Sequence, residues 1–314
     1  MNRLVDSHGR RLRKLRVSLT ESCNLRCFHC MKEDLPVAPP FAWLPPDELE
    51  GIVARLAALG IDQVRLTGGE PTLRPELREI VARLGRLPLR RLGITSNGVL
   101  LAPLLPELQA AGLGNLNLSL DSLDAATFAR ISGSPDHALV LRTLDQAIAL
   151  GLETKLNVVL FRGLNDHEAP ALVRFAEERG VAVRFLELMR IGPDQATNRR
   201  YFVSAAETLS LLRREGFRLR RRRAPADATA LEYRTADGGR LGFIASETRP
   251  FCAACSRLRL SAAGVLRACL MREEGICLRG LADGDWPAVL RQVLAWKPQS
   301  RPSHIGQPMV RIGG

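Results

Sequence analysis

The sequence predicts an α/β fold, an incomplete (βα)6 TIM-like barrel with a C-terminal extension that covers the open side. Two observations predict the barrel: short apolar runs alternate with longer amphipathic segments from residue 12 to about residue 190, and chemically distinctive residues follow the runs. Parallel barrels place their active sites at those strand ends. A third observation predicts the extension, since the pattern changes near residue 215 to a basic stretch.

Six apolar runs are the expected strands, and the amphipathic segments between them are the expected helices. The expected strands are 12–19, 63–67, 91–95, 115–120, 154–160 and 181–188. The expected helices are 46–59, 75–84, 103–111, 138–150 and 167–179. Several of these helices begin with proline in the first turn and end at glycine. Right-handed crossovers keep successive strands adjacent, so six units form most of a barrel and leave one side open.

The chain is expected to divide into a partial barrel over residues 1–215 and an extension over residues 216–314. Within the extension, Asp237-Gly238-Gly239 is a turn sequence that predicts a β-hairpin. Asp121 directly follows the fourth expected strand and is another polar residue in the position that suits an active site.

Composition narrows the class of protein. The 314 residues are 46% hydrophobic and 25% charged, which is enough to bury a full core. The chain shows no signal peptide and no apolar run long enough to span a membrane, so we expect a cytoplasmic protein with no membrane partner. A net charge of +12 indicates an anionic partner without choosing among nucleic acid, membrane surface and small phosphates. Seven cysteines without an export signal favour metal or redox chemistry over disulfides.

Three cysteines, Cys23, Cys27 and Cys30, directly follow the first expected strand, and we call them the N-terminal triad. Three thiolates can hold three corners of a cubane 4Fe-4S cluster and leave one iron open to a ligand that is not protein. Zinc binding or incidental burial are the alternatives. The second expected strand is followed by Gly68-Gly69-Glu70-Pro71, and glycines permit close backbone approach to a ligand.

This cysteine loop and glycine turn resemble the radical S-adenosylmethionine (radical SAM) superfamily, whose signature is C-x3-C-x2-C after the first strand. The resemblance implies that the N-terminal triad holds a 4Fe-4S cluster and that the cluster binds S-adenosylmethionine. It also implies which residues line the S-adenosylmethionine site: His29, Gly68, Gly69, Glu70, Ser119 and Met189.

A second group, Cys252, Cys255 and Cys269, is here called the C-terminal triad. With Cys277 these residues have a spacing that also suits a structural zinc ribbon, and spacing alone leaves both possibilities open.

Over nearly its whole length the chain resembles one subfamily, the GTP 3′,8-cyclases of molybdenum cofactor biosynthesis. The resemblance rests on the FC-x2-C-x-R-x-R stretch at 251–259, the three-cysteine second group and the closing Gly313-Gly314. It implies that the C-terminal triad holds a second 4Fe-4S cluster whose free iron faces guanine. Cys277 lies outside the family pattern and is left unassigned.

The same resemblance implies a GTP site. Its residues are Arg16, Arg65, Thr95, Lys155, Arg184, Arg257 and Arg259, and those with a catalytic role are Arg257, Arg259, Gly313 and Gly314, the last two as a tail that enters the active site. Arginine forks match phosphate oxygens, and a guanidinium inside an apolar strand is costly without a partner. Gln63 departs from the family, which often has a basic residue there, and we expect one phosphate contact fewer.

The implied reaction converts GTP to (8S)-3′,8-cyclo-7,8-dihydroguanosine 5′-triphosphate, a lyase reaction. A 5′-deoxyadenosyl radical removes hydrogen from ribose C3′, and the C3′ radical attacks C8 of guanine. The implied partners are an electron donor and a downstream cyclic pyranopterin monophosphate synthase, while a homodimer is left open.

Two rival functions stay in view. One is a peptide-modifying radical SAM enzyme, although such enzymes usually have more C-terminal cysteines. The other is a basic, zinc-stabilised nucleic-acid-binding protein. That second rival leaves the strand–helix alternation and the glycine turn without a role, and aromatic residues for base stacking make up only 5% of the chain. We therefore expect no nucleic-acid partner.

Overall fold

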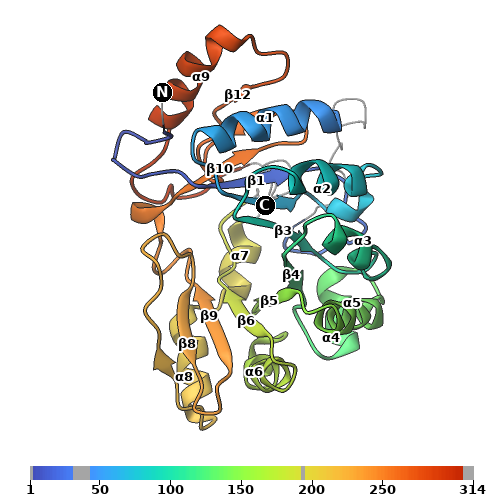
Figure 1. Cartoon of the computed structure of the whole chain (residues 1–314). Helices are drawn as coiled ribbons and strands as arrows, with labels where there is room; N and C mark the ends of the chain where they lie inside the picture. Colours follow the sequence, from blue (N-terminus) through green and yellow to red (C-terminus); the bar gives the residue numbers. More distant parts are fainter. Residues whose placement is uncertain (1–2, 31–42, 192–194, 307–314) are drawn as a thin grey trace.

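A continuous twelve-stranded sheet organises the computed structural model, which describes residues 3–30, 43–191 and 195–306 (Figure 1). Its middle is the predicted set of six parallel strands, in sequence order and each paired with the next. They are β1 (Lys14–Ser18), β2 (Gln63–Thr67), β3 (Arg91–Ser96), β4 (Asn115–Ser119), β5 (Glu153–Val159) and β6 (Ala182–Leu186). Each lies within one or two residues of its predicted range, so the predicted barrel order is confirmed.

The extension adds strands at both edges of this arc. At one edge β10 (Arg257–Leu260) pairs in parallel with β1, followed by β11 (Val265–Arg267) and β12 (Gly275–Cys277). At the other edge β9 (Arg240–Ile244) pairs in parallel with β6, followed by β8 (Leu231–Arg234) and β7 (Arg220–Arg221). The described sheet ends at β12 and β7 and does not close, which confirms the incomplete barrel.

The predicted hairpin joins β8 to β9 and is also confirmed. One sheet runs through both halves of the chain, so the division at residue 215 stays a prediction.

The helices that cover the outer side of the arc are close to those predicted (Figure 1). They are α1 (Pro46–Ala58), α2 (Leu77–Gly85), α3 (Leu105–Ala110), α5 (His137–Ala149) and α6 (Ala169–Glu178). The structure adds α4 (Ala125–Ser132), α7 (Gln195–Tyr201), α8 (Ala205–Arg214) and α9 (Trp286–Ala295), which the hydrophobic pattern did not predict. Of the helices in the described ranges, none combines the length and apolar character that crossing a bilayer requires.

Successive side chains along each strand face alternately the hydrophobic core and the inside of the barrel. Ile94, Leu116 and Leu156 are fully buried among the helices, as one face of each strand requires. Their neighbours on the opposite face are polar, such as Asn117 and Lys155. The inner face of the arc is therefore a polar lumen whose carboxyl end carries the N-terminal triad.

Candidate active site

The loop that carries the N-terminal triad leaves β1 and folds back against the end of α4. Arg26 N donates to the Ser132 carbonyl at 2.9 Å, and Phe28 N donates to the Ile131 carbonyl at 3.2 Å. A further main-chain bond of 3.0 Å, from Cys30 to Cys27, closes a tight turn between two of the thiols. Main-chain bonds thus set the course of the loop without any bound group.

Burial dominates the electrostatics of these thiols. It raises the pKa of Cys23, raises that of Cys27 far above its usual value, and raises that of Cys30 to about 12. The carboxylate of Asp121 raises the last two pKa values further. Leu25 N donates to Cys23 Sγ at 3.4 Å. Thiolates here need a cation to stabilise them, and the irons of a cluster would supply that charge.

Asp121, which directly follows the fourth predicted strand but was not assigned a role, has a pKa raised to about 7 by burial. Its carboxylate accepts a hydrogen bond of 2.8 Å from Val159 N. The acid thus acts on the thiols from the strand end where the sequence placed it, although the sequence did not assign it a role.

The two glycines after β2 lie against the loop that leads to the triad. A Cβ on Gly68 would lie 2.5 Å from the Thr20 carbonyl oxygen, and one on Gly69 would lie 2.3 Å from that of Ser22. Gly68 also has a φ of 154°. Main-chain bonds of 2.8 Å, from Gly69 to Thr20 and from Glu70 to Ser22, close the contact. The structure therefore gives the glycines a packing role, and their predicted contact with S-adenosylmethionine stays a prediction.

The buried Glu70 carboxylate joins its own loop to the end of β3, and the residue after β3 contacts the cysteine loop. The carboxylate accepts from Ser96 Oγ at 2.8 Å, from Asn97 N at 2.7 Å and from Thr72 N at 3.1 Å. Asn97 in turn donates to Asn24 Oδ1 at 2.8 Å, inside the cysteine loop. Burial raises the pKa of Glu70 although these hydrogen bonds oppose the rise. Glu70 therefore positions the loops around the triad.

The other predicted S-adenosylmethionine residues have separate surroundings. The His29 ring lies 4.8 Å from the Phe161 ring, and burial lowers its pKa to about 4, so the imidazole is neutral. His29 Nδ1 is buried and has no hydrogen-bond partner among the described residues, so it is available to a ligand. Ser119 is the last residue of β4, while Met189 follows β6 and packs in one small apolar cluster with Cys269. The two predicted sites thus approach each other at Met189.

Positive charge surrounds the C-terminal triad. Lys297 Nζ donates to Cys255 Sγ at 3.6 Å, and the charges of Arg257 and Lys297 lower the pKa of Cys255 to about 6 although burial acts to raise it. Burial raises the pKa of Cys252, and repulsion from Cys269 and Cys255 adds to the rise.

Lys297 and a second cation, Arg10, also donate hydrogen bonds to main-chain carbonyls near this triad. Lys297 is almost fully buried and donates to the carbonyls of Arg257 at 2.6 Å and Ala268 at 2.8 Å. Arg10 donates to the Cys252 carbonyl at 2.6 Å. Sequence reasoning missed both residues; the only signal was that lysine is rare in this arginine-rich chain.

Cys277 differs from the six triad cysteines. It is exposed, whereas they are partly buried, and its Sγ donates to the Ala263 carbonyl at 3.8 Å. Within the described ranges, no three Cys, His, Asp or Glu side chains are placed to hold a single metal ion.

The predicted phosphate-binding arginines line the lumen. In the strand register Arg16 pairs with Arg65 on one side and with Arg259 on the other. Burial lowers the pKa of Arg16 to about 10 and of Arg65 to about 9, and repulsion from neighbouring arginines adds to both shifts, with Arg184 acting on each. Burial also lowers the pKa values of Arg184 and Arg259. Arg257 lies over the Phe251 ring, 4.5 Å from its centroid. Such a concentration of one charge favours the binding of an anion.

Thr95 and Lys155 belong to the same lumen. Asn117 of β4 pairs with Thr95 of β3 and with Lys155 of β5, so all three lie at one level. The Thr95 hydroxyl is buried and finds no hydrogen-bond partner in the described part of the chain. It is therefore a further polar atom available to a ligand.

Arg65 occupies space that Gly93 leaves. It donates to the Ile94 carbonyl at 3.0 Å and to Asn115 Oδ1. A Cβ on Gly93 would lie 2.1 Å from Asn115 Oδ1 and 2.9 Å from Arg65 NH1. A side chain at Gly93 would thus displace the guanidinium. The predicted tail residues Gly313 and Gly314 lie outside the described residues.

Comparison with known proteins agrees with this geometry. The family model for the radical SAM superfamily matches residues 17–176, and the model for Molybdenum Cofactor Synthesis C matches residues 181–305. The fold is similar to that of Streptococcus suis SuiB bound to S-adenosylmethionine, with a TM-score of 0.64 and 16% identity over 90% of this chain and 67% of that one.

Curated relatives cover the whole chain. It is 44% identical to a GTP 3′,8-cyclase of Synechocystis sp., over 99% of this chain and 95% of that protein. It is 41% identical to one from Stenotrophomonas maltophilia over the full length of both, and 36% identical to the mitochondrial GTP 3′,8-cyclase of Arabidopsis thaliana over 99% of this chain and 83% of that protein. The chain therefore belongs to the radical SAM superfamily and, within it, to the GTP 3′,8-cyclase family.

Proposed function

We propose that this chain is a lyase that converts GTP to (8S)-3′,8-cyclo-7,8-dihydroguanosine 5′-triphosphate in molybdenum cofactor biosynthesis, with S-adenosylmethionine and two 4Fe-4S clusters as cofactors. One observation carries the proposal: a single lumen has a thiol triad at its carboxyl end, buried arginines along its wall, and a second triad beside the added strand β10. A radical source and an anionic substrate can meet in that arrangement.

The N-terminal triad suits a cluster with one open iron, because it offers three partly buried thiols and no fourth cysteine in its loop. A reduced cluster there would supply the 5′-deoxyadenosyl radical from S-adenosylmethionine. The protein's part is to place the cofactor and exclude water. His29 Nδ1 and the backbone after β2 are the groups available to hold it.

The C-terminal triad suits a second cluster with three thiolate ligands. Arg257 and Lys297 stabilise the Cys255 thiolate, and Cys277 faces the solvent instead of the other three thiols. These features favour the cluster over a four-cysteine zinc ribbon.

The lumen arginines would bind the triphosphate. Bidentate contacts from Arg16, Arg65 and Arg259 would fix the phosphates in the lumen, with the ribose directed toward the carboxyl end. Arg257 and Arg259 lie on the strand that follows Cys255, so the guanine would lie near the C-terminal triad. This charge distribution favours a triphosphate over a peptide substrate.

The proposal extends to partners and location. We propose an electron donor for the N-terminal cluster, a cyclic pyranopterin monophosphate synthase that takes the product, and a cytoplasmic location without nucleic-acid or membrane partners. A homodimer stays open.

Isotope transfer tests the reaction. Protein reconstituted with iron and sulfide without oxygen is incubated with dithionite, S-adenosylmethionine and GTP deuterated at C3′. We expect GTP-dependent 5′-deoxyadenosine that carries the deuterium, together with the cyclised nucleotide. Unlabelled 5′-deoxyadenosine, formed equally without GTP, would contradict the proposal.

A further inference from the structure

We propose that Arg91 binds the terminal phosphate of the nucleoside triphosphate, and that Glu153 occupies this phosphate's place in the free protein. This inference rests on the proposed function, because it assumes that the lumen holds a nucleoside triphosphate. It adds a specificity-determining residue that neither the family resemblance nor the sequence pattern identified.

Arg91 lies at the amino end of the lumen, opposite the N-terminal triad. It is the first residue of β3, as Asn115 is of β4 and Glu153 of β5. Side chains alternate along a strand, so Arg91 shares a face with Gly93 and Thr95, the lumen face. A ribose within reach of a radical at the carboxyl end would direct its phosphates toward this amino end.

One carboxylate bridges two cations here. Arg91 NH1 lies 3.3 Å from Glu153 Oε2, and Lys155 Nζ donates to Glu153 Oε1. The side chains of Arg91 and Glu153 are 45% and 41% exposed, so both can change position. Lys155 belongs to the predicted GTP site, and Glu153 therefore competes with phosphate for a residue of that site.

Positive charge exceeds what Glu153 neutralises. Arg91 is among the charges that lower the pKa of Arg65 and of Arg184, after burial as the main cause. Arg65, Arg184, Arg91 and Lys155 thus form a group of four cations that two carboxylates oppose, Glu153 at its centre and Glu232 beside Arg184. A terminal phosphate carries more negative charge than a carboxylate and can accept from several donors at once, so it is the better partner for this group.

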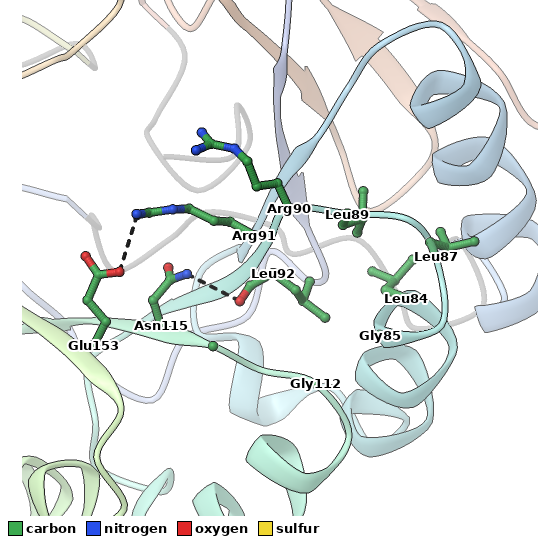
Figure 2. Close-up of a pocket in the computed structure, with 11 residues that line it drawn as sticks. Leu84, Gly85, Leu87, Leu89, Arg90, Arg91, Leu92, Gly112, Asn115 and Glu153 are labelled. Carbon is green, nitrogen blue, oxygen red and sulfur yellow. Dashed lines mark hydrogen bonds and ion pairs between the residues drawn. The ribbon is translucent and has the colours of Figure 1, made fainter. Parts of the chain in front are cut away.

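A cavity of about 300 Å³ borders this ion pair, between the amino ends of β3, β4 and β5 and the end of α2, and its wall includes Arg90, Arg91, Asn115 and Glu153 (Figure 2). Figure 2 shows the Arg91 side chain extended toward Glu153 across the start of the strands. A phosphate that enters between Arg91 and Lys155 would displace Glu153 toward solvent.

The register explains why Arg91 has this role in this chain. Gln63 of β2 pairs directly with Arg91 of β3, so the two lie side by side at one level of the lumen. Gln63 is uncharged at a position where we expected the loss of a phosphate contact. Arg91 supplies a cation one strand away.

Arg90 is a matched control on the same cavity. Its guanidinium lies 3.7 Å from Asp62, and the ion pair with Glu153 in Figure 2 comes from Arg91. Arg90→Ala therefore removes an identical side chain from the neighbouring position and leaves Arg91, Glu153 and Lys155 in place.

Calorimetric binding of GTP and GDP to the reconstituted, unreduced enzyme tests the inference. Arg91→Ala is expected to weaken GTP binding about tenfold, the scale of a partly exposed charged contact, and GDP binding much less. Arg90→Ala should leave both affinities within about twofold of wild type. Glu153→Gln should tighten GTP binding, because it removes the competing anion.

Equal losses for Arg91→Ala and Arg90→Ala would overturn the inference, since they would show only a general charge effect. Equal losses for GTP and GDP in Arg91→Ala would also overturn it, by placing the contact at an inner phosphate. Weaker GTP binding in Glu153→Gln would show that Glu153 positions Lys155 instead of competing with phosphate. Wild-type protein that binds neither nucleotide would contradict the proposed function itself.

Discussion

The two cysteine triads have the same number of thiols and opposite electrostatic surroundings. Around the N-terminal triad, burial raises the pKa values of all three thiols, and Glu70 adds to the rise at Cys23 and Asp121 at Cys27 and Cys30. Around the C-terminal triad, burial raises the pKa of Cys252, but the charges of Arg257 and Lys297 outweigh burial at Cys255 and lower its pKa. S-adenosylmethionine is a sulfonium cation, and GTP is a polyanion. We infer that local charge distinguishes the two proposed ligand sites. The cation is favoured beside the N-terminal triad and the anion beside the C-terminal triad.

The largest effect is expected for Cys27→Ser. Cys27 lies between the other two thiols of its loop, so its loss removes one of three anchors of the proposed N-terminal cluster. Reductive cleavage of S-adenosylmethionine, measured as 5′-deoxyadenosine, should fall to background. GTP binding should stay within about twofold of wild type, because the lumen arginines are untouched. Normal cleavage would contradict the role of this triad.

Arg16→Met should have opposite effects on the stability of the protein and on its affinity for GTP. The buried Arg16 guanidinium is repelled by Arg257 and Arg184, so methionine is expected to raise the free energy of unfolding of nucleotide-free protein by about 1 kcal/mol. GTP affinity should fall by roughly 2–4 kcal/mol, the scale of losing one partner of a desolvated charge pair. Denaturation and calorimetry measure the two quantities. Arg291→Met, on the exposed side of α9, is the control and should change neither. A less stable Arg16→Met protein would contradict the repulsion.

Lys297→Met tests the effect of the positive charge beside Cys255 on the C-terminal triad. The variant loses the charge next to Cys255 and leaves two buried carbonyls without their donor, at a cost of about 1–3 kcal/mol in stability. In a background without the N-terminal triad, the reduction potential of the remaining cluster should become more negative. Lys297→Arg keeps the charge and should restore it. Equal potentials in the Met and Arg variants would show that charge at this position does not matter.

The smallest effect is expected for Cys277→Ser. The thiol is exposed and only weakly bonded to Ala263, so iron content and turnover should match wild type within error. Loss of about half the iron would make Cys277 a ligand and would remove the three-thiol symmetry between the triads.

Hydrophobic periodicity, together with the prolines and glycines at helix ends, predicted the six barrel strands and five of the helices. Each of these elements has a buried apolar face that gives such a pattern. The same reading missed α8, although Ser204 and Glu207 form a capping box at its start, with Glu207 N donating to Ser204 Oγ at 3.2 Å. It also missed α4 and α9. The parallel pairing of β10 with β1 joins residues far apart in sequence, and no local pattern encodes such a contact.

The site was partly visible in the sequence. The resemblance to the GTP 3′,8-cyclases implied Arg16, Arg65 and Arg184, and their place in apolar strands, where an unpaired guanidinium is costly, supported that prediction. Arg91 gave no such signal, since an arginine at a strand start is ordinary, and only the register places it beside Gln63 and across from Glu153. Lys297 was missed because its thiol partner is 42 residues away.

Iron content of the two triads tests the central claim most directly. Three chains are purified and reconstituted without oxygen: wild type, one with serine at all three N-terminal triad positions, and one with serine at all three C-terminal triad positions. We expect about eight iron atoms per wild-type chain and about four in each variant, one cluster per triad. Wild-type protein with about four iron atoms and one zinc, with the zinc lost from the C-terminal variant, would contradict the second cluster.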